Sequence, residues 1–318
     1  MSTVADNADF GWGIPPSRQG SRRIPPGSAS ASQLVQHPSA MRRFVRVFFG
    51  RRIVIFGTAV ILLLIFSAIF ADLISPYDPY KQDLRVSLQQ PSRAHLLGTD
   101  ALGRDTLSRI IYGTQTSLAV GFVSVVIAGF FGMAFGLLAG YLGGVVDTLI
   151  MRFVDALMAV PSLMLALAIG SALGGGLTNI MISLGISLIP TYARLMRGQV
   201  LTVKRTDFVL AGDVVGASDL RIMLAHVLPN CFSPLIVLLT LNLGFAILSE
   251  AGLSFLGLGI TPPGAAWGSM VADGYRYLFT NPVLSFAPGL CVMLVVLAFN
   301  LVGDGLRDAL DPRLRGTL

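Results

Sequence analysis

Long uninterrupted apolar runs alternate with shorter polar segments along this chain. The first run covers 53–71, which is 19 residues without a charged side chain. A bilayer core about 30 Å thick needs about 20 consecutive apolar residues for one helical span. Further apolar runs follow at 117–140, 150–173, 178–195, 231–256 and 284–303. The pattern therefore predicts six transmembrane helices.

Continuous apolar runs argue against a membrane-spanning β-barrel, whose strands alternate apolar and polar residues over about ten positions. Two runs are irregular, because the third carries Arg152 and Asp155 near its start and the fourth contains Pro190. Composition agrees with a membrane protein, since 53% of residues are hydrophobic and 13% are charged. Soluble domains carry about 25% charged residues. The expected fold class is an all-α integral membrane protein with about six transmembrane helices.

A partly polar loop at 207–230 separates the fourth run from the fifth. Asp207 is expected to cap a first short helix and Gly216 to end it, while Ser218 caps a second helix with Asp219 in its first turn. A membrane span needs no such element. A helical hairpin at the surface of a membrane bundle indicates contact with another protein.

The distribution of charge predicts how the bundle is oriented. Residues 1–52 hold eight Arg against two Asp, and five of these Arg immediately precede the first span. This is the positive-inside pattern of membrane proteins. We prefer it to nucleic-acid binding as the explanation of the chain's net positive charge. With six spans, the N-terminus, the 207–230 loop and the C-terminus are all expected in the cytoplasm. The segment 72–115, with equal numbers of basic and acidic residues, is expected outside.

The chain shows no secretory signal, because its N-terminus is polar and the first apolar run begins late. The segment 41–52 alternates Arg with Phe and Val, so it either lies along the inner membrane surface or simply flanks the first span. The expected organisation begins with a disordered tail at 1–40, the basic segment at 41–52 and a first span at 53–71. An extracytoplasmic segment at 72–115 follows. The rest is a five-helix core at 116–303, with its loop at 204–230, and a cytoplasmic tail at 304–318.

Motifs for catalysis or nucleotide binding are missing from the sequence. The chain has two lysines, Lys81 and Lys204, and neither follows a glycine as the P-loop requires. The three histidines are scattered, so we expect no catalytic residues, no metal site and no cofactor on this chain. Cys231 and Cys291 are expected to be small buried thiols.

Glycines recur at short intervals within the second predicted span and just after it. Small residues three or four positions apart let membrane helices approach closely. We therefore expect helix packing, rather than a nucleotide-binding loop, at Gly129, Gly132, Gly136, Gly140, Gly143 and Gly144.

Ionisable residues within apolar runs are candidates for function. Arg152 and Asp155 are three residues apart, which favours a local ion pair on one helix face. Glu250 has no basic residue within seven positions, so it needs a partner on another helix, access to water, or a proton. A structural interhelix hydrogen bond is favoured for Glu250, with a lining position in a transport pathway as the alternative.

Four separated stretches resemble the C-type permease subunit of dipeptide and oligopeptide ABC importers, a family that includes nickel and glutathione importers. They are HLLGTDALGRDTLSRIIYGTQTSL at 95–118, GASDLRIMLAHVLPN at 216–230, EAGLSFLGLGITPPGAAWGSM at 250–270 and NLVGDGLRDALDPR at 300–313. The resemblance covers about 41–315, with the motifs in the expected order. It implies a subunit without enzyme activity that works with a second, B-type permease, two ATPase subunits that bind ATP and Mg²⁺, and an extracytoplasmic binding protein.

The resemblance also assigns roles to positions of this chain. It places the ATPase contact in the 207–230 loop, at Asp207, Ala211, Gly212, Asp213, Gly216, Ala217, Ser218, Asp219, Arg221, Leu228 and Pro229. The residues themselves predict a folded outer cap, because the stretches 98–100 and 103–105 are turn-prone and charge-balanced and suit Arg–carboxylate pairs. The expected cap residues are Gly98, Thr99, Asp100, Gly103, Arg104, Asp105, Ser108 and Arg109. These cap residues either stabilise the cap alone or touch a binding protein. Pro262, Pro263 and Trp267 suggest a rigid turn beside an interfacial aromatic anchor, and 304–313 a solvated tail helix.

One departure from the family's pattern lies in the loop. The family's loop usually opens Glu-Ala-Ala, and here those positions hold Leu210, Ala211 and Gly212. We hypothesise that Asp213 supplies the missing acidic group. The alternative is that this subunit contributes the weaker of two ATPase contacts. The expected substrate is a dipeptide or oligopeptide, with a nickel complex or a glutathione-like molecule as the alternative. The rival class is a secondary transporter working alone, which commonly shows internal repeats and paired intramembrane charges.

Overall fold

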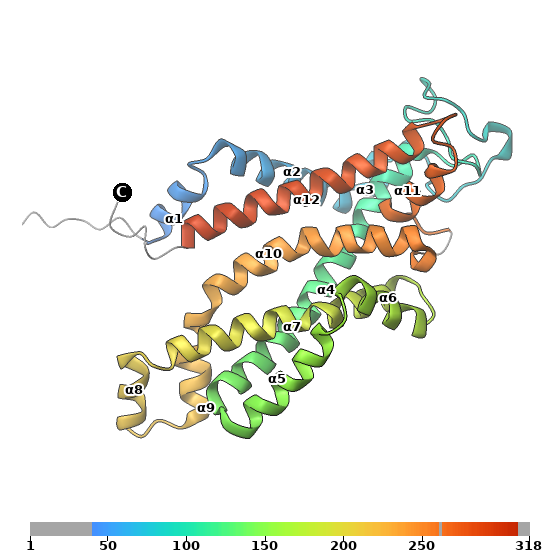
Figure 1. Cartoon of the computed structure of the whole chain (residues 1–318). Helices are drawn as coiled ribbons and strands as arrows, with labels where there is room; N and C mark the ends of the chain where they lie inside the picture. The colour runs from blue at the N-terminus through green and yellow to red at the C-terminus, as the bar shows by residue number, and fades with distance from the viewer. Residues whose placement is uncertain (1–39, 261–262, 311–318) are drawn as a thin grey trace, which may run out of the picture. The chain divides into compact units, whose positions relative to one another are not determined.

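A computed structural model of the chain describes residues 40–260 and 263–310. Positions 1–39 of the tail expected at 1–40, Pro262 and the end of the chain from 311 therefore lie outside the described residues. The regular elements in the described ranges are helical (Figure 1). They are α1 Ala40–Phe48, α2 Arg52–Ile69, α3 Ala71–Ile74, η1 Leu84–Val86, α4 Thr106–Leu142, α5 Gly144–Met158, α6 Ser162–Ala172, α7 Leu177–Val203, α8 Asp207–Val214, α9 Asp219–Arg221, η2 Ile222–Val227, α10 Leu228–Leu253, η3 Ser254–Leu258, α11 Trp267–Tyr275 and α12 Val283–Leu310.

Four continuous helical segments of the described chain are long and apolar enough to cross a membrane. They overlap the predicted first, second, fifth and sixth runs, and they are Arg52–Ile69, Thr106–Leu142, Asp219–Leu258 and Val283–Leu310. At about 1.5 Å per residue, the 37 residues of α4 exceed the thickness of a bilayer core. The second and fifth predicted runs are therefore parts of helices that continue beyond the membrane.

The predicted third span at 150–173 is not one helix. It is divided between α5 and α6, which meet at an angle of 88°. Pro161 stands at the break, in the position before α6. A proline disfavours helical geometry at the preceding residue and lacks the N–H that would continue the helix. The two halves together supply one broken span.

The predicted fourth span corresponds to α7, which keeps Pro190 in its interior. Its 27 residues suffice to cross a bilayer, although serines, threonines and two arginines lower its hydropathy. Ile180 and Tyr192 on α7 are completely buried within the bundle. A helix that contacts protein on several sides does not need a lipid-compatible surface all round. With α7 and the broken span included, the predicted all-α membrane fold with about six spans is confirmed.

Glycines on α4 allow α7 to approach its backbone. A Cβ atom built at Gly132 would lie 2.5 Å from the Tyr192 Cβ, and one at Gly136 would lie 2.4 Å from the Ala193 carbonyl oxygen. A Cβ at Gly140 would lie 2.9 Å from Val200 of α7, whereas one at Gly129 would lie 2.9 Å from Leu239 of α10. The predicted role of these four glycines in packing is confirmed.

Gly143 and Gly144, which the sequence grouped with the packing glycines, serve a different purpose. Both have positive φ angles, of 68° and 53°, and both face open space. Glycine adopts this backbone region without the steric cost that a side chain would add. The pair forms the turn that ends α4 and starts α5, so its predicted role in packing is wrong.

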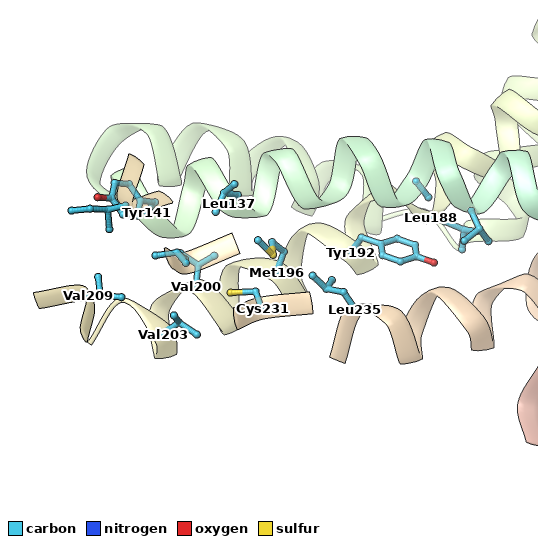
Figure 2. Close-up of a cluster of buried hydrophobic side chains, with 14 of the residues drawn as sticks. Leu137, Tyr141, Leu188, Tyr192, Met196, Val200, Val203, Val209, Cys231 and Leu235 are labelled. Atoms are coloured by element: carbon cyan, nitrogen blue, oxygen red, sulfur yellow. The ribbon is translucent and has the colours of Figure 1, made fainter. Parts of the chain in front are cut away.

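The largest buried apolar cluster joins α4, α7 and α10 and continues into α8 (Figure 2). Tyr192 and Met196 of α7 lie between Leu137 of α4 and Leu235 of α10. Val209 of α8 belongs to the same cluster. The loop at 207–230 therefore shares a core with three long helices. Cys231 is buried in this cluster, and both Cys231 and Cys291 are free thiols.

The end of α12 continues as one helix through the expected boundary at residue 304, instead of forming a separate tail. It packs against α1 and α2, where a Cβ at Gly305 would lie 2.7 Å from Val54 and 3.4 Å from Phe48. Arg51, between α1 and α2, forms an ion pair with Asp308 at 2.7 Å. Most of the basic segment at 41–52 is thus helical, in α1, and the segment is attached to the end of the last span.

Candidate functional site

The loop at 207–230 forms a hairpin of α8 and the start of the α10 helical segment, and we call it the coupling hairpin. Asp207 was expected to cap the first helix, but Thr206 holds that position and Asp207 lies in the first turn. Neither Thr206 nor Ser218 makes a capping hydrogen bond through its side chain. An acidic residue in the first turn still interacts favourably with the helix dipole.

Gly216 ends α8, as the sequence predicted. Its φ angle is +82°, and its N–H donates to the Asp213 carbonyl while Ala217 N–H donates to the Gly212 carbonyl. This pair of hydrogen bonds is the Schellman arrangement, which requires a left-handed residue at the glycine position. The chain therefore turns sharply after one short helix.

The second helix of the hairpin is not a separate short element. α9 passes through the π-helical segment η2 directly into α10, and one continuous segment runs over Asp219–Leu258. Pro229 stands one residue after the start of α10. Its ring conflicts with the carbonyl four residues earlier, and a locally widened π turn relieves that conflict. The hairpin is consequently a rigid extension of the fifth span.

Apolar and polar contacts both attach the hairpin to the bundle. Val209 of α8 and Ile222 of η2 are buried in the core shared with α4, α7 and α10. The Tyr141 hydroxyl, at the end of α4, donates to Asp219 at 3.0 Å. The Lys204 ammonium donates to the Tyr141 carbonyl at 2.6 Å. Tyr141 therefore connects the hairpin with the ends of both α4 and α7, a role that the sequence did not reveal.

The outer surface of the coupling hairpin is apolar at its tip. Val214 and Val215 are 88% and 87% exposed, and Phe208, Leu210 and Leu220 are also exposed. Contiguous exposed apolar side chains of this kind mark protein contact sites. Sequence reasoning named the polar and small residues around this surface but missed the two valines, although a Val-Val pair before a turn glycine was a visible signal.

The predicted contact residues divide into two groups. Asp207, Ala211, Asp213, Ser218, Asp219, Arg221 and Pro229 are exposed, whereas Gly212, Gly216, Ala217 and Leu228 shape the backbone or face the core. Asp213 makes no ion pair within the described part of the chain. A Cβ at Gly212 would meet Ile222 at 3.6 Å, which is ordinary contact. Packing therefore does not demand the glycine.

The outer cap is organised around Asp100. One carboxylate oxygen accepts hydrogen bonds from the backbone N–H groups of Leu102 and Arg104, each at 2.9 Å. The other oxygen accepts from Arg104 Nε at 2.6 Å and lies 3.6 Å from Arg109 Nε. Both arginines are buried. The predicted Arg–carboxylate pairs are present.

Asp105 begins α4 at its N-cap. Its carboxylate accepts from the Ser108 N–H and hydroxyl, each at 2.8 Å, and lies 2.9 Å from His95 Nδ1. Thr99 is buried, and its hydroxyl bonds to the Val86 carbonyl. Capping by aspartate satisfies an otherwise unpaired N–H at the helix start. The cap and the second span are therefore one structural unit.

Two glycines let the cap fold tightly. Gly98 and Gly103 have φ angles of +73° and +72°. A Cβ at Gly103 would lie 1.8 Å from the Asp83 carbonyl oxygen, and one at Gly98 would lie 2.3 Å from the Gln89 carbonyl oxygen. Any larger residue at either position would displace the chain.

Arg109 and Trp267 join the cap to the segment before α11. Arg109 donates to the carbonyl oxygens of Pro79, Pro263 and Gly264 at 3.1–3.3 Å. Trp267 was expected at the membrane interface, but it is 0% exposed and its Nε1 donates to the Ile110 carbonyl at 3.0 Å. Gly113 makes room for its ring. The anchor prediction is wrong because a close glycine, invisible in local sequence, admits the indole into the core.

Glu250 is 0% exposed, near the end of α10. The Ser254 hydroxyl, one turn further along, donates to Glu250 Oε1 at 2.6 Å. The other oxygen, Oε2, meets no hydrogen-bond partner in the described ranges. The favoured interhelix bond is thus replaced by a bond within the helix, and complete burial keeps Glu250 away from any open pathway in this conformation.

The predicted pair of Arg152 and Asp155 is wrong. Asp155 pairs with Arg194 of α7 at 2.6 Å, and Asp147 of α5 accepts two hydrogen bonds from Arg197, both at 2.6 Å. An arginine on a facing helix reaches a carboxylate in better geometry than a neighbour three residues away. Two ion pairs therefore hold α5 against α7.

Comparison with known families gives two matches. Residues 132–316 match the model of the "binding-protein-dependent transport system inner membrane component". Residues 39–91 match the "N-terminal TM domain of oligopeptide transport permease C". Together they extend over most of the chain, including the coupling hairpin, α7, α10 and the end of α4.

Several curated proteins are similar over almost their whole length. The di/tripeptide transport system permease protein DppC of Pseudomonas aeruginosa is 45% identical over 293 residues, which is 90% of this chain and 96% of that protein. The glutathione transport system permease protein GsiD of Pectobacterium atrosepticum is 41% identical over 275 residues, or 86% of this chain and 91% of that protein.

A solved structure shares the fold at low sequence identity. It is an inward-facing conformation of the MetNI methionine ABC transporter, with a TM-score of 0.53 and 19% identity. The match covers 64% of this chain and 97% of the matched chain. The likeness establishes the arrangement of helices and nothing about the substrate.

Proposed function

Because the chain belongs to the family of binding-protein-dependent transport system inner membrane components, we propose that it is the C-type permease subunit of an ABC importer for dipeptides or short oligopeptides. It is a multi-pass inner-membrane protein of a family whose members are permease subunits and not ATPases. The observation that carries the mechanism is the coupling hairpin, which exposes an apolar tip and shares its core with α4, α7 and α10.

The substrate proposal rests on the names of relatives. The protein at 45% identity is a di/tripeptide permease, and the one at 41% is a glutathione permease. Glutathione is itself a tripeptide with an unusual linkage, so uptake of glutathione is the second candidate. Competition for uptake between a labelled dipeptide and glutathione separates the two.

The proposed assembly contains a B-type permease, two ATPase subunits and an extracytoplasmic binding protein. The ATPases bind ATP and Mg²⁺ at their own sites, and this chain supplies neither a catalytic residue nor a metal ligand. The N-terminus, coupling hairpin and C-terminus face the cytoplasm, in keeping with the basic residues before the first span. The cap then faces outward, towards the binding protein.

The hairpin transmits force because it is continuous with a long helix. Closure of the ATPases displaces the tip at Val214 and Val215. The motion passes through Val209 and Ile222 into the shared core, and along the 40-residue segment Asp219–Leu258 towards the outer half of the membrane. The hairpin moves the bundle and does not react.

The test replaces both tip valines by aspartate, which adds charge to an apolar contact surface. The variant should insert normally, because both side chains are almost fully exposed, yet it should lose most ATPase subunits on purification and most uptake. A matched control is Leu84→Asp, at an exposed apolar position in the cap. Full retention of the ATPases by the valine variant would remove the hairpin from the proposed interface.

The acidic group of the hairpin is tested separately. Replacing Asp213 by Ala should lower the stimulation of ATPase activity by loaded binding protein by several-fold, because the proposal gives Asp213 the role of the missing glutamate. Asp304→Ala, which removes an exposed carboxylate on α12 outside the hairpin, is the control. Unchanged stimulation in the Asp213 variant would refute that substitution hypothesis while leaving the hairpin's apolar contact intact.

A further inference from the structure

A cavity of about 210 Å³ lies between the outer cap and α11. The cap contributes Asp100, Arg104 and Thr106, and α11 with the residues after it contributes Asp273 and Arg276. One water molecule needs about 10–15 Å³ of such space. The cavity is therefore large enough for a small organic group together with several waters.

Two residues that line this cavity each carry a buried donor without a hydrogen-bond partner in the described ranges. The donors are Arg104 Nη1 and the Thr106 hydroxyl. The Arg104 side chain is 5% exposed and Thr106 is 1% exposed. A buried donor without an acceptor costs about 1–3 kcal/mol, and more when the group is charged. Two such donors on residues that line one cavity favour the binding of an acceptor there.

The acids that line the cavity do not satisfy these donors. Asp100 already accepts from two backbone N–H groups and from Arg104 Nε, and it also pairs with Arg109. Asp273 is exposed and forms no ion pair in the described part of the chain. Three arginines and two aspartates line the cavity, so one added negative charge would balance it.

We propose that this cavity binds a carboxylate group, whose oxygens accept hydrogen bonds from Arg104 and Thr106 while Arg276 contributes charge at its edge. A guanidinium fork matches the planar geometry of a carboxylate. The group comes either from a small free acid outside the cell or from an aspartate or glutamate side chain of the docked binding protein. The second source rests on the proposed function, and the first does not.

Thr106→Val is the decisive variant, because it removes a hydroxyl that makes no hydrogen bond in this structure and keeps the side-chain shape. It should fold normally, whereas Arg104→Gln also breaks the bond to Asp100. Thr202→Val, on α7 and far from the cap in the fold, is the control, since its hydroxyl bonds only to the Gly198 carbonyl of its own helix.

In the first arm, the complete transporter in nanodiscs is titrated with sodium acetate against equal sodium chloride. Hydrogen–deuterium exchange is followed in peptides that cover 98–109 and 268–277. Acetate should slow exchange in both peptides, and Thr106→Val should raise the half-effective acetate concentration about tenfold. Thr202→Val should leave it unchanged.

In the second arm, the affinity of the binding protein for the same nanodiscs is measured with and without acetate. A side-chain source predicts that acetate competes with docking and that Thr106→Val weakens docking about tenfold. If the carboxylate comes from a free acid, acetate should still slow hydrogen exchange in both peptides, but the affinity of the binding protein should not change. Absence of both effects overturns the proposal. If no binding protein docks on the wild type, that result counts against the proposed function, and the acetate arm still decides the carboxylate site.

Discussion

The coupling hairpin and the outer cap are both compact loops attached to α4, but opposite kinds of contact hold them. The hairpin is anchored by Val209 and Ile222 in an apolar core, with one polar contact from Tyr141 to Asp219. The cap is cross-linked by a buried network in which Asp100 serves two arginines. Apolar contacts tolerate small relative movements, whereas buried charge pairs are directional.

The difference suggests a division of labour along the second span. Asp105 fixes the start of α4 within the cap, and Tyr141 connects its other end with the hairpin. A rigid cap gives a fixed surface for an incoming partner. A hairpin held by apolar contacts can shift together with α10 while its exposed tip stays in contact with the proposed ATPase.

The largest effect is expected in the cap, where Asp100→Ala leaves two buried arginines without their carboxylate. Removal of one partner of a buried pair typically costs about 3–5 kcal/mol. Hydrogen exchange in peptides covering 83–109 should accelerate strongly, with the hairpin peptides unchanged. Asp207→Ala, in the hairpin, serves as the control. Equal acceleration at both sites would show that the two regions are not independent.

A smaller effect is expected in the hairpin from Tyr141→Phe. The substitution removes one hydrogen bond to an exposed carboxylate, which contributes about 1 kcal/mol, and it keeps the buried ring. Uptake should fall by several-fold while the transporter still assembles with its ATPases. Tyr112→Phe, which removes the hydroxyl that bonds to Asp72 near the other end of α4, is the matched control. A loss of assembly in Tyr141→Phe would mean that this contact holds the hairpin in place.

The smallest effect is expected from Gly212→Ala, which should stabilise the hairpin slightly instead of weakening it. A helical glycine costs about 1 kcal/mol relative to alanine, and the added Cβ meets Ile222 at an ordinary 3.6 Å. The free energy of local opening of α8, measured by hydrogen exchange, should therefore rise slightly. Gly216→Ala is the control. It should lower the free energy of local opening, because the positive φ angle at this position favours glycine. A destabilising Gly212→Ala would show that the hairpin core is tighter than its distances indicate.

Features that depend on local chemistry could be predicted from the sequence. The apolar runs predicted the spans, the glycine spacing on α4 predicted close helix packing, and Gly216 predicted the end of α8. Each follows from one segment and one physical rule. The Arg–carboxylate pairs of the cap followed from a short charged segment in the same way.

Features that depend on distant partners could not be predicted. Asp155 pairs with Arg194 rather than with Arg152, and Trp267 enters a space left by Gly113. The partners lie tens to more than a hundred positions apart in the sequence. The break at Pro161 was a local signal, but the apolar run on both sides outweighed it. The valines at the hairpin tip matter only once the fold shows them exposed.

The most direct test of the account is photo-crosslinking from the two regions in native membranes. Val215→Cys in the hairpin and Leu96→Cys in the cap, both at exposed positions, carry the same thiol-reactive photo-crosslinker, with Cys231 and Cys291 replaced by alanine. The account predicts that the hairpin probe captures an ATPase subunit and that the cap probe captures the binding protein. Capture of the ATPase from the cap, or its absence from the hairpin in an assembled transporter, would contradict the account.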